Sequence, residues 1–248
     1  MNPVLLVIAG PNGSGKTTVT VSLRENHWSD GVEYLNPDDI AQEKFGGWNS
    51  RDAVLKAAVW TTNRREELLS ARKGIAFETV FSAPDKLLFL QRAREAGYFL
   101  RVFFVGTESP TINAARVARR VIEGGHSVPI EKIISRFEKS TGNLAVALTI
   151  ANRVYIYDNS LEGADARLCA RTHDGMLRKF MASCPIGFRM PSRIYRFIPS
   201  SKTREQPDLT PLEKRHTFPH APCPPKNRVL RVAPELLPSS SPVGIGDA

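Results

Sequence analysis

Cysteine is scarce in this chain of 248 residues, and long apolar runs are missing. The three cysteines, Cys169, Cys184 and Cys223, have neither the spacing of a disulfide framework nor that of a metal site, so we expect a reducing cytoplasm. No apolar run approaches the roughly 18 residues of a membrane helix, so we expect no membrane association. The apolar stretch Val4 to Ala9 lacks the basic segment that precedes the core of a signal peptide, and we interpret it as a strand.

A strong excess of one charge is also missing from most of the chain. The net charge is +9, but ten basic and five acidic residues follow residue 182, so the preceding part has a surplus of only four. Basic residues interleaved with aromatic residues, the pattern of a nucleic-acid groove, are not found. We therefore expect no nucleic-acid partner, and the mildly basic surface suits a protein that handles phosphate esters.

Short β-branched runs alternate with longer helical stretches, which predicts a three-layer α/β/α domain over residues 1–181. The five predicted strands, mostly parallel, are Val4–Ala9, Val32–Asn36, Ile75–Thr79, Phe99–Val105 and Val154–Tyr157. The predicted helices are Lys16–Glu25, Asp52–Arg72, Ala83–Glu95, Thr111–Glu123 and Ile130–Ala151. Twelve of the 18 prolines lie in residues 182–248, where no periodicity persists, so we expect a largely disordered tail there.

A complete G-x-x-x-x-G-K-[ST] motif follows the first predicted strand. Its residues, which we call the P-loop, are Gly10, Pro11, Asn12, Gly13, Ser14, Gly15, Lys16 and Thr17. The glycines let successive N–H groups turn toward phosphate oxygens, and Thr18 extends this predicted ATP site into the next helix. We expect Lys16 to contact the β- and γ-phosphates of ATP and Thr17 to bind Mg²⁺.

Sequences typical of several other P-loop classes are missing. We find no N-K-x-D motif for guanine recognition and no serine–glycine signature of transport ATPases. The P-loop motif alone does not define a reaction. Because the motifs of these other classes are missing, a small kinase is the favoured class.

Acidic residues follow two predicted strands at the edge where α/β sheets bind ligands. Asp38 is our candidate general base for an acceptor hydroxyl, although Asp38 or Asp39 would equally suit the N-cap of the next helix. Glu78 and Thr79 are candidates for substrate binding, and a backbone N–H or a lysine is the alternative partner of Glu78. Asp158 would suit a metal site, but a turn is the favoured interpretation.

Three arginines are candidates for binding the triphosphate. Arg116 and Arg120 lie one turn apart on one predicted helix, and Arg136 lies on the next. Arg120 is also our candidate for stabilising the transition state. A glycine–proline break at residues 124–129 separates the two helices and is typical of a moving lid. A solvated basic face is the alternative.

The ordered set of four segments resembles the zeta-toxin family of P-loop kinases, most of all its compact bacterial branch of predicted ATPases. The segments, which span most of residues 1–180, are the P-loop, Asn36-Pro37-Asp38, Phe77-Glu78-Thr79 and Arg116 to Pro129. The resemblance implies a kinase that phosphorylates the 3′-hydroxyl of UDP-N-acetylglucosamine, with an antitoxin protein as a candidate partner. By position, it also implies that Asp38 is the general base and Glu78 a sugar-contacting acid. Family members use two arginines on ATP phosphates; Arg120 matches one, and Arg136 is the candidate for the other.

Two other functions remain open at this point. In the first, the chain is a kinase whose acceptor hydroxyl belongs to a nucleoside, an antibiotic or a polynucleotide end, for which the same P-loop and base would serve. Alternatively, the chain is a nucleotide-switched binding module, which needs neither an acceptor nor a general base.

Overall fold

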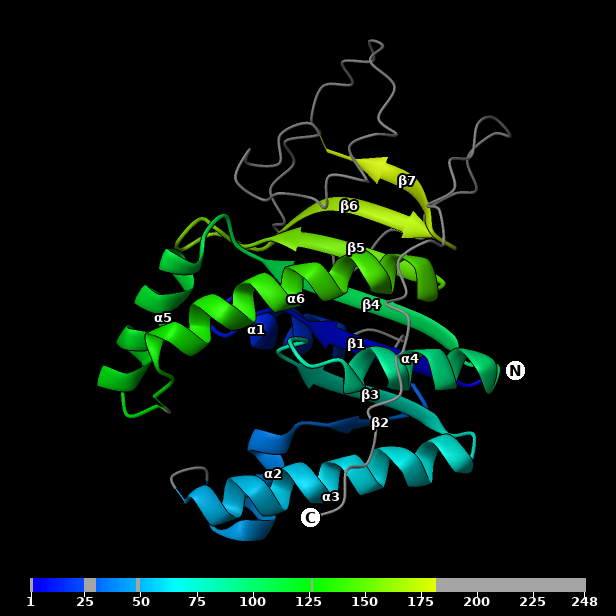
Figure 1. Ribbon diagram of the computed structural model, residues 1–248, viewed down its shortest axis with the longest axis horizontal. Coiled ribbons are helices and arrows are strands. Elements are labelled where there is room, and N and C mark those ends of the chain that lie inside the picture. Colours follow the sequence, from blue (N-terminus) through cyan, green and yellow to red (C-terminus); the bar gives the residue numbers. More distant parts are fainter. Residues whose placement is uncertain (1, 25–29, 48–49, 126, 182–248) are drawn as a thin grey trace, which may run out of the picture.

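A computed structural model describes residues 2–24, 30–47, 50–125 and 127–181 of the chain (Figure 1). The predicted tail, residues 182–248, lies outside the described residues. The strands are β1 Val4–Ala9, β2 Val32–Leu35, β3 Gly74–Thr79, β4 Phe99–Gly106, β5 Arg153–Asp158, β6 Arg167–His173 and β7 Met176–Phe180. The helices are α1 Lys16–Arg24, α2 Pro37–Phe45, α3 Arg51–Ser70, α4 Asp85–Glu95, α5 Pro110–Ile122 and α6 Ile130–Ile150.

The strands form one sheet in the order β2-β3-β1-β4-β5-β6-β7. The first five of these strands pair in parallel, as predicted, and β6 and β7 are joined to them in antiparallel pairs. The sheet therefore has seven strands and not the predicted five, because the hairpin of β6 and β7 was not predicted. Its strands alternate polar and apolar residues irregularly, so they gave no continuous apolar run like that of β1.

Two helical layers cover the sheet (Figure 1). Helices α3, α4 and α6 pack on one face, over the odd-numbered residues of β1, and this side contains the larger apolar core. Helix α1 packs on the other face, over Leu6 and Ile8. A strand whose two faces are both buried explains why β1 is apolar throughout. The predicted three-layer α/β/α class is confirmed.

The carboxyl end of β1 lies at the centre of the functional edge of the sheet. Ala9, its last residue, pairs with Thr79 of β3 on one side and with Phe104 of β4 on the other. In a parallel sheet with helices on both faces, loops that follow such central strands meet in a crevice that binds ligands. The sheet thus brings the loops after β1, β2, β3 and β4 to one edge.

Cys169 on β6 is fully buried. In the described part of the chain, every helix is too short or too polar to cross a membrane.

Candidate active site

The P-loop connects the end of β1 to the start of α1. Gly13 and Gly15 have φ angles of 75° and 87°, in the region that only glycine adopts without strain. A Cβ on Gly13 would lie 2.5 Å from the carbonyl oxygen of Asn113, and one on Gly15 would lie 2.1 Å from Nδ2 of Asn159. Both the backbone conformation and the surrounding atoms therefore require glycine at these two positions.

Lys16, the first residue of α1, is half-buried, and its Nζ donates a hydrogen bond to the carbonyl oxygen of Pro11 at 3.1 Å. Burial lowers the pKa of Lys16 to about 8; the charges of Glu78 and Asp38 act to raise this pKa, and that of Arg120 acts to lower it. These side chains come from α1, β3, α2 and α5, yet they lie close enough to interact. The structure thus gathers four of the predicted site residues around the P-loop.

Glu78, near the carboxyl end of β3, is held by two hydroxyl groups. Thr20 Oγ1 and Tyr34 OH both donate to Glu78 Oε1, at 2.5 and 2.8 Å. Burial and the negative charge of Glu78 raise the pKa of Tyr34 above its usual value, so the phenol remains a donor. The two hydrogen bonds to Glu78 thus come from hydroxyl groups, and not from the backbone N–H or the lysine considered as alternative partners.

Asp38 and Asp39 occupy the first turn of α2, and both are exposed. The N-cap is Asn36, whose side-chain oxygen accepts a hydrogen bond from the N–H of Asp38 at 3.0 Å. The capping role considered for the two aspartates is therefore wrong, because an asparagine fills it. Desolvation and then the charges of Glu78, Asp38 and Glu43 raise the pKa of Asp39, which shows that acidic groups crowd this corner.

A pocket of about 430 Å³ opens beside this acidic corner, between α1, α2 and strands β1 to β3. Its polar lining includes Thr20 and Tyr34, the two residues that hold Glu78, together with Asn36, Asp39 and Glu43. Its apolar lining is Leu6, Ile8, Leu23, Val32, Ile40 and Ala76. Among the described residues that line it, none is a lysine or an arginine. The pocket therefore combines an apolar wall with an acidic rim.

The three candidate arginines lie in different environments. Arg120 is exposed on α5, and its charge acts on Lys16. Arg136, on α6, reaches the P-loop directly, because its Nη1 donates to Asn12 Oδ1 at 3.2 Å. Arg116 faces the connection between β5 and β6, where it donates to the carbonyl oxygens of Asn159 at 2.7 Å and Leu161 at 3.3 Å. Direct contacts of these arginines with ATP stay predictions, and the geometry favours Arg120 and Arg136 over Arg116.

Thr17 and Thr18 are exposed in the first turn of α1. The hydroxyl of Thr17 is therefore accessible, and it would be a ligand of a Mg²⁺ ion bound with the nucleotide. Within the described residues, no group of three or more His, Cys, Asp or Glu side chains is arranged to hold a metal. A P-loop magnesium needs no such group, because phosphate and water oxygens fill most of its coordination sites.

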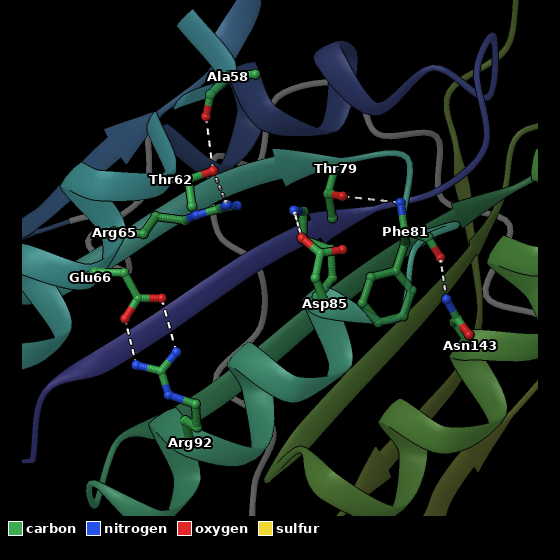
Figure 2. Close-up of polar contacts among 10 residues, drawn as sticks. Ala58, Thr62, Arg65, Glu66, Thr79, Phe81, Asp85, Arg92 and Asn143 are labelled. Carbon is green, nitrogen blue, oxygen red and sulfur yellow. Dashed lines mark hydrogen bonds and ion pairs between the residues drawn. The ribbon is translucent and has the colours of Figure 1, made fainter. Parts of the chain in front are cut away.

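Thr79 and Asp158 both shape turns. Thr79 Oγ1 accepts a hydrogen bond from the N–H of Phe81 at 3.0 Å, and the carbonyl oxygen of Phe81 accepts one from Asn143 at 2.9 Å (Figure 2). The predicted contact of Thr79 with substrate stays a prediction. Asp158 is buried, and its Oδ1 accepts the N–H of Ser160 at 3.1 Å, which agrees with the favoured interpretation of a turn.

Four residues that contact this site were not identified from the sequence: Thr20, Tyr34, Asn113 and Asn159. Thr20 lies one turn after Lys16 on the same face of α1, so helical spacing would have indicated it. Tyr34 is close to the end of a strand that leads to the functional edge. Asn113 and Asn159 touch the P-loop only because the fold brings distant segments together, and no local pattern indicates them.

A central parallel sheet, a glycine-rich loop between β1 and α1, and charged side chains around the loop's lysine define the class: a P-loop nucleotide-binding protein. Within this class the chain belongs to the zeta toxin family, whose model matches residues 1–165, and it is therefore an ATP-dependent kinase.

The chain is also similar to several individual proteins. A Haemophilus influenzae protein of uncharacterized function is 24% identical over 128 residues, which is 52% of this chain and 88% of that protein. The crystal structure of the AvrRxo1-ORF1:ORF2 complex with ATP has a TM-score of 0.55 and 16% identity, covering 84% of this chain and 67% of that chain. A structure from the PezAT toxin–antitoxin system of Streptococcus pneumoniae has a TM-score of 0.49 and 17% identity, covering 64% of this chain and 69% of that chain.

Proposed function

We propose that the protein transfers the γ-phosphate of ATP, with Mg²⁺, to a hydroxyl group of a small molecule. The favoured acceptor is a UDP-amino sugar, UDP-N-acetylglucosamine at its 3′-hydroxyl, because the chain belongs to the zeta toxin family. The observation that carries the reaction type is the placement of Asp38, Glu78 and Arg120 near Lys16, where their charges act on its pKa. A base, a fixed acid and a cation around the P-loop lysine are the groups that phosphoryl transfer needs.

The P-loop residues suit a triphosphate. The loop leads into the N-terminus of α1, where backbone N–H groups and the helix dipole favour an anion. Lys16 would exchange its bond to the Pro11 carbonyl for bonds to phosphate oxygens. Thr17 would hold the Mg²⁺, which neutralises phosphate charge when it is bound.

Asp38 is the general base in this proposal, and Glu78 orients the acceptor. Asp38 is exposed at the start of α2, so its carboxylate is free to accept a proton from an incoming hydroxyl. Glu78 is less suited to accept that proton, because Thr20 and Tyr34 already donate to its Oε1. It therefore serves as a fixed negative charge beside Lys16 and as an acceptor for a second substrate hydroxyl.

The test is phosphate transfer from γ-labelled ATP with Mg²⁺ and a panel of UDP-sugars. We expect Asp38→Asn to lower turnover by roughly 10²- to 10⁴-fold while ATP still binds. The matched control is Asp52→Asn, because Asp52 also lies exposed in the first turn of a helix but pairs with Lys56 on α3. Equal turnover of the Asp38→Asn and Asp52→Asn proteins would exclude the assigned base.

One observation favours a second acceptor class. The pocket rim carries Asp39 and Glu43 without a basic residue among its described lining, and such a rim repels a diphosphate and attracts an amine. An amine-bearing hydroxyl compound, such as an aminoglycoside antibiotic, is therefore the second candidate. Including such compounds in the panel separates the two classes directly, since only one class would accept label.

We further propose that the protein acts in the cytoplasm, where ATP and sugar nucleotides are available, and that an antitoxin protein binds it. The support for a partner is the family, together with the matched AvrRxo1-ORF1 structure, which is a complex with the AvrRxo1-ORF2 protein. Co-purification of the tagged chain with the product of an adjacent gene would test this assembly.

A further inference from the structure

Two asparagine side chains hold carbonyl groups of the P-loop from outside the loop. Asn113 Nδ2, on α5, donates to the carbonyl oxygen of Asn12 at 2.6 Å. Asn159 Nδ2, just after β5, donates to the carbonyl oxygen of Ser14 at 2.9 Å. The two bonds reach the same loop from segments that lie about 100 and 145 residues away in the sequence.

Each of these bonds also sets the direction of an N–H group. A trans peptide unit is planar, and its carbonyl oxygen and N–H hydrogen point in opposite directions. A carbonyl of Asn12 that points outward to Asn113 therefore directs the N–H of Gly13 away from Asn113. In the same way, the bond from Asn159 to the Ser14 carbonyl directs the N–H of Gly15 away from Asn159. The interior of a P-loop is where phosphate oxygens bind.

We propose that Asn113 and Asn159 are positioning residues that pre-orient the N–H groups of Gly13 and Gly15 for binding phosphate. The inference rests on the proposed binding of nucleotide at the P-loop and adds the residues that keep the loop in its binding conformation. Neither asparagine needs to touch the nucleotide. The benefit is preorganisation, because N–H groups that already point inward need no rearrangement when phosphate binds.

Both asparagines are themselves held in place. Asn113 is fully buried, and the hydroxyl of Thr107 contacts its Oδ1, so the amide nitrogen is left to face the loop. Both backbone polar groups of Asn159, the N–H and the carbonyl oxygen, form hydrogen bonds. Its N–H donates to the carbonyl oxygen of Gly106 at 2.8 Å, and its carbonyl oxygen accepts from Arg116 at 2.7 Å. Arg116 therefore supports the P-loop through Asn159.

The requirement for glycine in the loop follows from the same contacts. The Cβ positions of Gly13 and Gly15 would collide with Asn113 and Asn159, respectively. Glycine at these positions lets the two residues approach the loop closely. The loop glycines and the two asparagines thus form one arrangement.

The experiment measures binding of magnesium pyrophosphate to the full chain by calorimetry, since this probe needs only the phosphate cradle. The variants are Asn113→Ala and Asn159→Ala. Asn143→Ala is the matched control, because the side-chain amide of Asn143 also donates a hydrogen bond to a backbone carbonyl oxygen, that of Phe81, at 2.9 Å (Figure 2). We expect both test variants to bind pyrophosphate about tenfold more weakly or worse, and the control to bind like the wild type.

Glycine amide signals in an NMR spectrum of protein labelled with ¹⁵N-glycine separate positioning from general loosening. In Asn159→Ala the signal of Gly15 should lose its response to pyrophosphate while that of Gly13 keeps it, and Asn113→Ala should show the reverse. Arg116→Ala should affect Gly15 and leave Gly13 unchanged. If Asn113→Ala does not fold, the pattern in Asn159→Ala and Arg116→Ala still decides the question.

Binding by both asparagine variants that equals binding by Asn143→Ala would overturn the inference. So would an equal change of both glycine signals in every variant. A wild-type chain that binds neither pyrophosphate nor ADP would overturn the proposed function and this inference together. Intact pyrophosphate binding without phosphate transfer would count against the proposed function alone.

Discussion

At the scale of single residues, the site depends on charges that act on one lysine. The motif predicted Lys16 at the phosphates, and spacing along the strands predicted Asp38 and Glu78 at the same edge. These residues were predictable because each belongs to a short local pattern. Thr20 and Tyr34, which fix Glu78, were not predicted, because their contacts with it span 58 and 44 residues.

The pH dependence of nucleotide affinity follows from the lowered pKa of Lys16, about 8 in the free protein. Below this pH the lysine is protonated and attracts phosphate. Above it, each further pH unit should weaken ADP binding, by up to about tenfold. Calorimetric titration with ADP between pH 6.5 and 9.5 measures the pH at which the affinity begins to fall, which we call the bend.

The direction in which variants move this bend is also fixed. Glu78→Gln removes a charge that raises the pKa of Lys16, so the bend should shift to lower pH. Arg120→Ala removes a charge that lowers it, so the bend should shift to higher pH. A flat profile across pH 8, or shifts in the same direction, would contradict the assigned contacts.

Arg120 and Arg119 form a matched pair on α5. Arg119 pairs with Glu162 and Glu123, whereas the charge of Arg120 acts on Lys16. We therefore expect Arg120→Ala to lower kcat by roughly 10²-fold or more, because the variant lacks the arginine that we propose to stabilise the transition state. Arg119→Ala should change kcat by less than about twofold, since an exposed ion pair contributes little. Steady-state kinetics on both variants tests this, and equal losses would remove Arg120 from the catalytic role.

At the scale of elements, the sequence predicted the parallel part of the sheet and missed the antiparallel hairpin of β6 and β7. A continuous apolar run identifies a strand buried on both faces, whereas β6 and β7 carry several polar residues and lack that pattern. One local signal was present. Asp174 and Gly175 join the two strands with φ angles of 47° and 70°, and Asp-Gly is a typical sequence of such a two-residue turn.

Two glycine substitutions should change stability in opposite directions. Gly175→Ala places a side chain at a positive φ in the hairpin turn and should lower the free energy of unfolding by about 1 kcal/mol. Gly142 lies within α6, and a Cβ there would meet open space. Gly142→Ala should therefore raise the free energy of unfolding by roughly 0.5–1 kcal/mol. Urea denaturation measures both, and a stabilising Gly175→Ala would contradict the described turn.

At the scale of the whole molecule, the sheet and its two cores unite the described residues into one unit. The larger core joins residues of β1, β3 and β4 to α3, α4 and α6, and the smaller one joins β1 to α1. The loops that form the site all begin on strands of this sheet, so its rigidity positions them. The boundary predicted at residue 181 stays a prediction.

Truncation after residue 182 tests that boundary. We expect residues 1–182 to fold and to bind ADP with an affinity within about twofold of the full chain, because the site residues and both cores lie within them. Circular dichroism and calorimetry measure the two properties. Failure of the shortened chain to fold would show that the removed residues belong to the domain.

Phosphoryl transfer from ATP to an acceptor hydroxyl can be followed by ³¹P NMR of one reaction mixture. The mixture contains the full chain, Mg²⁺, ATP and UDP-N-acetylglucosamine, with an aminoglycoside in a parallel tube. If the protein is such a kinase, a new phosphomonoester signal grows in step with ADP and is absent with the Asp38→Asn protein. Release of inorganic phosphate alone, at a rate that neither acceptor nor Asp38→Asn changes, would exclude phosphoryl transfer to these acceptors.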